Sequence, residues 1–278
     1  MFLYQLRNEL WKLFGKKRTY LGFAMFLLAQ NVVTLLFRFT RASRDMVRTL
    51  EGNGYAAGDY ISSLTIATVM LFPIAYVLLP LYVSLVGGDL VAKEAEDGTL
   101  RMILSRPISR VRLLLLKWLS GTIFSFLLVI ALGAFGVLFA RVWFPWGGLF
   151  AYIPGELFNV YDAQSGLGHY TAAHLMLWTK ACSVMGLAFM LSCFNVKPAA
   201  ATILALSFVF INFILQQIPF FHEYRQWFLS YHLNLWQLLF AKQIPWWKVG
   251  QSLSILFGFN LTFVVVGCMA FHVRDIKS

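Results

Sequence analysis

The stretch LLLLKWLSGTIFSFLLVIALGAFGVLFA occupies residues 113–140, and Lys117 is its only charged side chain. A helix needs about 20 mostly apolar residues to cross the hydrocarbon core of a bilayer, so this stretch predicts a membrane span. Five other runs meet the same requirement, and they cover residues 19–37, 61–86, 172–193, 199–218 and 250–271. The sequence therefore predicts an all-α integral membrane protein with six transmembrane helices, built as one domain over residues 1–278.

The composition agrees with this fold class. Hydrophobic residues make up 59% of the chain and charged residues 13%, whereas soluble proteins average about 45–50% and about 25%. The net charge of +11 fits the excess of Lys and Arg in the cytoplasmic loops of membrane proteins, so we expect no nucleic-acid partner. The three cysteines lie inside apolar runs and match neither a disulfide framework nor a zinc-binding spacing; we expect no metal site.

Two of the runs carry local signals. The first follows Lys16, Lys17 and Arg18, as the core of a signal peptide would, but it is longer than such a core and no small-x-small cleavage pattern follows it. We therefore expect a retained helix. The second run contains Pro73 and Pro80, which predict a kink because proline interrupts the helical hydrogen bonds.

The distribution of Lys and Arg predicts the orientation. With a cytoplasmic N-terminus, 14 of these residues fall in segments on the inside and 8 in segments on the outside. Cytoplasmic loops carry the excess of positive charge, so both termini are expected in the cytoplasm. Four arginines after the first span are unusual for an outer loop, and their role stays open: Arg38, Arg41, Arg44 and Arg48.

The N-terminal segment shows helical periodicity. Its apolar residues recur at spacings of three and four, at Leu3, Leu6, Leu10, Leu13 and Phe14. The polar residues Gln5, Arg7, Asn8, Glu9 and Lys12 fill the other face. This pattern predicts an amphipathic helix that lies in the membrane interface; the alternative is a cytosolic helix packed on protein.

Two longer connections lie on the predicted outer side. Residues 219–249 are rich in Phe, Tyr and Trp but are broken by Pro219, Pro245 and several polar residues. A re-entrant or interfacial helical region before the sixth span is expected there, because irregular backbone at membrane depth must be buried in protein. Residues 141–170 are expected to form a loop rich in Gly, Pro and aromatic residues.

The most charged interruption between spans is residues 87–117, GGDLVAKEAEDGTLRMILSRPISRVRLLLLK. After Gly98, the apolar residues Leu100, Ile103 and Leu104 follow at helical spacing, and Pro107 ends the pattern. This predicts a short cytoplasmic helix with one apolar stripe, which needs a partner on the membrane or on another protein. The alternative is a plain basic cytoplasmic loop.

The string Glu94-x-x-x-Gly98-Thr99-Leu100, with Leu104, Pro107-x-Ser109-Arg110 and Lys117 after it, resembles the ABC type-2 permease family. It is similar to the permease subunits associated with bacitracin resistance, nitrous oxide reductase and sodium export. The six spans, the amphipathic N-terminal helix, the broken region before the last span and the tail pattern at Phe271, Arg274 and Asp275 agree in outline.

The resemblance implies a function and a set of partners. The segment would be a coupling helix that docks on a separate ABC ATPase subunit, and the docking residues would be Glu94, Glu96, Asp97, Gly98, Thr99, Leu100, Ile103, Leu104, Arg106, Pro107, Ser109 and Arg110. The chain would pair with an identical or a related permease in a bacterial inner membrane and would export a substrate. ATP and Mg²⁺ would bind the partner ATPase, and this chain would bind no cofactor.

The sequence contains no phosphate-binding Gly-x-x-x-x-Gly-Lys-[Ser/Thr] pattern and no His-Glu-x-x-His or Gly-x-Ser-x-Gly pattern. We therefore expect a transport subunit rather than an enzyme. Two alternatives remain: a membrane scaffold or sensor coupled to an ATPase, and a membrane enzyme that modifies lipids.

Lys180 and Asn212 are polar residues inside predicted spans and are candidates for a substrate pathway. A snorkelling or structurally paired lysine, and an interhelical hydrogen bond for the asparagine, are the alternatives.

Overall fold

The computed structural model describes residues 2–105, 108–153 and 157–274. Among these residues, six helices are long and apolar enough to cross a membrane. The first is α2 (Lys17–Phe39), the third is α8 (Arg110–Trp143), and the last three are α9 (Ala163–Cys193), α10 (Pro198–Gln217) and α12 (Trp246–Val273). The second span combines α5 (Ser63–Pro73), the π-helical turn η1 (Ile74–Leu78) and α6 (Leu79–Glu96). The predicted all-α membrane fold is confirmed.

Between the two prolines that predicted a kink, the second span contains a π-helical turn. It begins directly after Pro73 and ends just before Pro80, which lies in the first turn of α6. Proline cannot donate a backbone hydrogen bond, so the two prolines limit the regular ladder that can form between them. The second span is therefore one apolar rod with a local irregularity at Tyr76.

Two spans extend beyond their predicted ends. α9 begins at Ala163, nine residues before the apolar run, because Asp162 caps it by accepting hydrogen bonds from the backbone N–H groups of Gln164 and Ser165 at 3.1 Å. α6 continues past residue 86 as far as Glu96. Hydropathy marks only the part of a helix that is apolar, so it misses polar ends that continue outside the bilayer.

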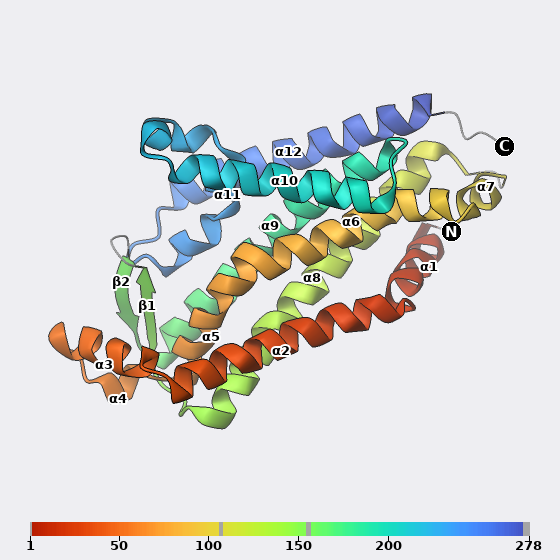
Figure 1. Ribbon diagram of the computed structural model, residues 1–278. Coiled ribbons are helices and arrows are strands. Elements are labelled where there is room, and N and C mark those ends of the chain that lie inside the picture. Colours follow the sequence, from red (N-terminus) through yellow and green to blue (C-terminus); the bar gives the residue numbers. More distant parts are fainter. Residues whose placement is uncertain (1, 106–107, 154–156, 275–278) are drawn as a thin grey trace.

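At one end of the bundle, the structure forms a small layer that the sequence analysis assigned to loops (Figure 1). It contains α3 (Ala42–Gly52), α4 (Ala57–Tyr60) and an antiparallel hairpin of β1 (Leu149–Ile153) and β2 (Leu157–Tyr161). Leu50, Ala57 and Phe150 form its buried centre. These apolar residues are few and far apart in the sequence, so no hydrophobic periodicity predicts the layer. α1 (Phe2–Phe14), α7 (Thr99–Leu104) and the C-terminal end of α12 lie at the opposite end of the bundle.

α9 is the central helix of the bundle, and α6, α8, α10 and α12 all pack against it. α6 approaches α9 closely at Gly87, where an added Cβ would collide with the backbone carbonyl of Met185. At the next position, a Cβ on Gly88 would meet Thr202 of α10. Small residues of this kind let transmembrane helices pack with their backbones close together. The outer helices α2, α10 and α12 are far less buried, as expected for helices that face lipid.

The region before the last span is broken, as predicted. It consists of η2 (Pro219–Trp227), α11 (Leu229–Leu233) and η3 (Leu235–Phe240). η3 packs against α9, and Trp236 and Phe240 in η3 are fully buried. Whether this region and α1 lie in the membrane interface stays a prediction.

We predict that Gly87→Ala lowers the melting temperature of the purified protein in detergent. The methyl group has to displace the α9 backbone at Met185, and overpacking of this kind costs about 1–3 kcal/mol. Gly250→Ala in α12 is the matched control, because nothing lies within 4 Å of its added Cβ; this variant should melt at the same or a slightly higher temperature. Equal melting of both variants would contradict the close approach of α6 and α9.

Candidate functional site

The segment predicted as a coupling helix forms a distinct turn and helix. α6 ends at Glu96, Gly98 adopts a left-handed conformation with φ of +72°, and α7 runs from Thr99 to Leu104. Glycine tolerates that backbone without strain, so the chain can reverse sharply there. The hydroxyl of Thr99 donates to the backbone carbonyl of Glu94 at 3.3 Å and ties the start of α7 to the end of α6. The next helix, α8, starts at Arg110 after the cap at Ser109.

The apolar stripe of α7 faces its own chain. Leu100 is 2% exposed, and Ile103 and Leu104 are partly buried against the main core. The stripe was expected to need an external partner, but the bundle already supplies one. The face directed outward carries Arg101 and Met102, which the sequence analysis passed over although they lie between the stripe residues; Met102 is 66% exposed.

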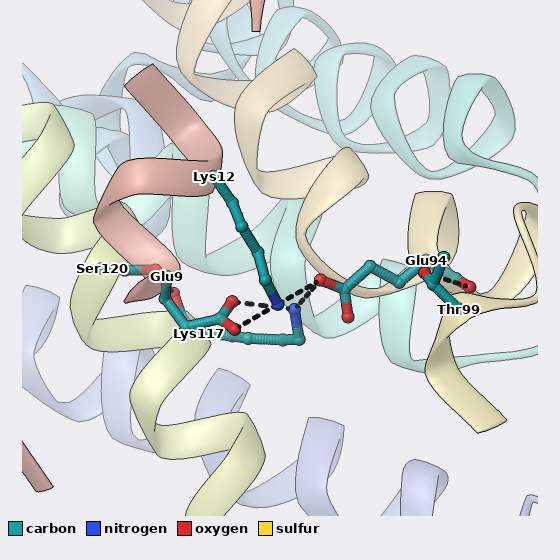
Figure 2. Close-up of polar contacts among 6 residues, drawn as sticks. All are labelled: Glu9, Lys12, Glu94, Thr99, Lys117 and Ser120. Carbon is teal, nitrogen blue, oxygen red and sulfur yellow. Dashed lines mark hydrogen bonds and ion pairs between the residues drawn. The ribbon is translucent and has the colours of Figure 1, made fainter. Parts of the chain in front are cut away.

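Behind α7, four charged residues form a cluster that we call the ion cluster: Glu9, Lys12, Glu94 and Lys117 (Figure 2). Lys12 Nζ lies 2.6 Å from Glu9 Oε1 and 3.1 Å from Glu94 Oε1. Lys117 Nζ lies 3.0 Å from Glu9 Oε2 and 2.7 Å from Glu94 Oε1. Each ammonium group therefore contacts both carboxylates. The cluster joins α1, α6 and α8 at the end of the bundle that carries α7 (Figure 1).

Burial makes the charged groups of the ion cluster depend on one another. Lys117 is 1% exposed and Glu9 is 8% exposed, so each charge has lost most of its hydration and depends on its partners. Burial alone would raise the pKa of Glu9, but the attraction of Lys117 and Lys12 outweighs it and holds the pKa below the ordinary value. Burial likewise opposes charge on Lys12, yet Glu9 and Glu94 raise its pKa above the ordinary value. The two pKa shifts therefore both favour the charged forms of Glu9 and Lys12.

The N-terminal helix differs from its predicted arrangement at Glu9. α1 forms as expected, but Glu9, which was assigned to the polar outer face, is buried together with Leu6 and Leu13. The reason is its pairing with Lys117, which comes from a distant part of the sequence. Trp11 on the outer face is exposed.

The side chains of two predicted docking residues bind other parts of this chain. Glu94 contributes to the ion cluster, and its side chain is 16% exposed. Arg110 Nη1 donates to the backbone carbonyls of Phe271, His272 and Arg274 at 3.0–3.3 Å, where a cation stabilises the C-terminal end of α12.

The other predicted docking residues are distributed unevenly. Glu96, Asp97, Gly98 and Ser109 are exposed, and Thr99 is partly buried. Arg106 and Pro107 lie outside the described residues, and so does Asp275 in the tail pattern. Lys93 pairs with Glu96 at 2.8 Å and with Asp97 at 3.1 Å on the surface. The docking assignment itself stays a prediction.

A second ion pair supports the same end of the bundle. Arg18, at the start of α2, contacts the buried carboxylate of Asp89 in α6 at 2.5 Å. Close by, the hydroxyl of Tyr82 donates to the backbone carbonyl of Thr19 at 2.9 Å. The first span is therefore attached to the helix that ends at α7.

The two candidate pathway residues lie in different surroundings. Lys180 is 4% exposed, and its Nζ donates to Asn234 Oδ1 at 3.0 Å. Asn212 is partly buried on α10 and donates to the backbone carbonyl of Phe208 in its own helix at 2.9 Å. The structure does not bring these two side chains together.

The arginines after the first span are all exposed at the end of the bundle opposite α7. Arg38 lies 5.9 Å from the ring of Phe144, and Arg48 lies 3.9 Å from Asp45. Within the described residues, no group of three or more His, Cys, Asp or Glu side chains is arranged to hold a metal ion.

Six membrane-crossing helices with a short exposed helix between the second and third define a multi-pass all-α membrane protein. The sequence matches the family described as "ABC-2 family transporter protein" over residues 15–226. The chain belongs to this family of ABC-2 transporter proteins. The resemblance read from the sequence is confirmed.

One curated relative is the "Uncharacterized protein YhcI" of Bacillus subtilis (strain 168). It is 27% identical over 145 residues, which are 50% of this chain and 42% of the relative. The match thus spans less than half the length of that protein, and the relative's printed name gives no activity.

We predict that Lys117→Met destabilises the protein by about 3–5 kcal/mol, because Glu9 and Glu94 then keep a buried negative charge without full compensation. The double variant Lys117→Met/Glu94→Gln restores a balanced cluster and should recover part of the loss. Thermal unfolding of the three proteins in the same detergent measures the effect. A single variant as stable as the unchanged protein would contradict the burial of the cluster.

The lowered pKa of Glu9 predicts how stability depends on pH. The stabilisation from charged Glu9 should be fully present above the ordinary value of 4.5 and should be lost as the pH falls through the lower pKa of the folded state. The melting-temperature difference between the unchanged protein and Glu9→Gln should therefore be constant near neutral pH and shrink below about pH 4.5. A melting-temperature difference that does not shrink below about pH 4.5 would contradict the lowered pKa of Glu9.

Proposed function

We propose that the chain is the membrane-spanning subunit of an ATP-driven exporter, and that a separate ABC ATPase subunit docks on α7. The observation that carries this proposal is the placement of α7. This helix lies beyond the end of α6 and presents Arg101 and Met102 outward. It directly follows α6, and the ion cluster connects α6 with α1 and α8.

The ion cluster offers a physical route for transmitting force. A push on α7 reaches α6 through the turn at Gly98 and the hydrogen bond between Thr99 and Glu94. Glu94 in turn is held to Lys12 and Lys117. Because the pairs that buried Lys117 makes with Glu9 and Glu94 resist separation, α1, α6 and α8 would move together rather than one at a time.

The docking surface we propose is narrower than the segment predicted from sequence. It consists of the exposed residues Glu96, Asp97, Arg101 and Met102, with Ser109 at its edge. Glu94, Leu100 and Arg110 would act indirectly, by holding α7 and the ends of its neighbours in position. ATP and Mg²⁺ would bind the partner subunit.

The assembly we propose contains two permease chains, identical or related, and two ATPase subunits. Its site would be a bacterial inner membrane, with α7 and both described ends of the chain on the cytoplasmic side. This orientation rests on the excess of Lys and Arg in the inside segments. The same orientation places α3, α4 and the β-hairpin on the outer side, since they lie at the other end of the bundle.

We predict that Asp97→Arg and Met102→Asp reduce recovery of the ATPase subunit with the tagged chain by about tenfold, as expected when a central interface residue is lost. The measurement is purification from native membranes in mild detergent, followed by an ATPase assay. Asp45→Arg is the matched control for charge reversal, because Asp45 is exposed at the opposite end, and it should leave recovery unchanged.

Either of two results would contradict the proposal. If no nucleotide-binding subunit accompanies the unchanged protein, the chain does not work with an ATPase under these conditions. If both α7 variants recover the ATPase as well as the control does, the docking surface lies elsewhere on the chain.

A further inference from the structure

Lys180 is an ionisable residue in the middle of the central helix of the bundle. At a rise of 1.5 Å per residue it lies about 25 Å from the start of α9 and about 20 Å from its end. Its side chain is directed into the protein, where Nζ meets Asn234 Oδ1 at 3.0 Å and lies 4.8 Å from the centre of the Tyr76 ring. A lysine at this depth with inward contacts does not reach water by snorkelling.

The partners of Lys180 are neutral. None of the ion pairs between described residues includes it, whereas Lys117, the other deeply buried lysine, has two carboxylates. An amide oxygen and an aromatic face lower the cost of burying a cation, but they do not balance its charge. Ionisable residues inside membrane spans are costly and commonly mark sites where polar substrates or ions bind.

The surroundings of Lys180 are built to hold its partners in place. Gln237 Nε2 donates to the Tyr76 hydroxyl at 2.7 Å, and Tyr76 lies in the π-helical turn of the second span. Ser230 Oγ lies 2.7 Å from Gln216 Oε1 and thereby links α11 to α10. π-helical turns inside helices frequently occur at functional sites.

A small cavity of about 20 Å³ adjoins Lys180 and Asn234. This volume is enough for about one water-sized group, so in the present conformation the site could admit a single oxygen atom but no large molecule. The cavity is walled on one side by Val209, Phe210 and Phe213 of α10. α10 is much less buried than α9, so it is the wall that can move at the lowest cost in lost packing.

We propose that Lys180 and Asn234 form a binding site for the anionic group, a carboxylate or a phosphate, of an amphiphilic molecule that this permease carries. The inference rests on the proposed function and adds a substrate class to it. The anionic group would supply the negative charge that pairs with the Lys180 ammonium group. Asn234 would donate a hydrogen bond to it from its amide nitrogen. The apolar remainder of the molecule would lie against the phenylalanines of α10.

The test uses the purified full chain in nanodiscs of phosphatidylcholine, with radiolabelled oleate as the anionic probe and oleamide as its neutral counterpart. Binding is measured as the excess over empty nanodiscs. We expect saturable binding of oleate and none of oleamide. Lys180→Met should weaken oleate binding by about tenfold or more, the size expected when a charge-assisted hydrogen bond is lost, while Lys180→Arg should retain most of it.

Lys248→Met is the matched control, because Lys248 is exposed and should leave oleate binding unchanged. The melting temperature separates a binding role from a structural one. Methionine removes an uncompensated buried charge, so Lys180→Met should melt at the same or a higher temperature than the unchanged protein.

Three outcomes would overturn the site. These are equal binding of oleate and oleamide, oleate binding that survives Lys180→Met, and loss of binding together with a lowered melting temperature, which would make the lysine structural. Recovery of the ATPase subunit with Lys180→Met is a separate readout that should stay unchanged. The proposed function can therefore stand even if this site fails.

Discussion

Lys117 and its two carboxylate partners connect parts of the chain that are more than a hundred residues apart. Glu9 comes from the N-terminal helix and Glu94 from the end of the second span, and both meet Lys117 near the start of the third span. A buried ammonium group loses its hydration and requires this compensation. The position of α1, the length of α6 and the starting geometry of α7 all depend on the ion cluster, because each contributes or adjoins one of its members.

The two deeply buried lysines of the bundle illustrate different uses of the same side chain. Lys117 is matched by carboxylates and has a structural consequence, since it fixes three helices at the end that carries α7. Lys180 is matched only by an amide and an aromatic ring, and it adjoins a cavity beside a lightly packed helix. The paired charge of Lys117 stabilises one arrangement of α1, α6 and α8. Lys180 has no carboxylate partner among the described residues, so its ammonium group favours the binding of an anion.

The packing of the bundle separates a rigid part from a part that can rearrange. α6 and α9 approach closely at Gly87 and form the most heavily buried pair of spans. α10 is joined to α11 by hydrogen bonds from Ser230 to Asn212 and Gln216, and α10 is among the least buried spans. A rearrangement of the bundle is easier at α10 than between α6 and α9, because separating α10 disrupts fewer buried contacts.

The sequence by itself determined the six spans, the break in the second span, the amphipathic N-terminal helix and the short helix after Gly98, because each rests on local chemistry: apolar length, proline, helical periodicity and a glycine turn. It also contained the family motif. Only the tertiary structure decided that Glu9 is buried, that Glu94 and Arg110 bind within the chain, and that Lys180 meets Asn234. Those contacts join residues from distant segments, and a linear pattern shows which residues are charged but not which of them meet in space.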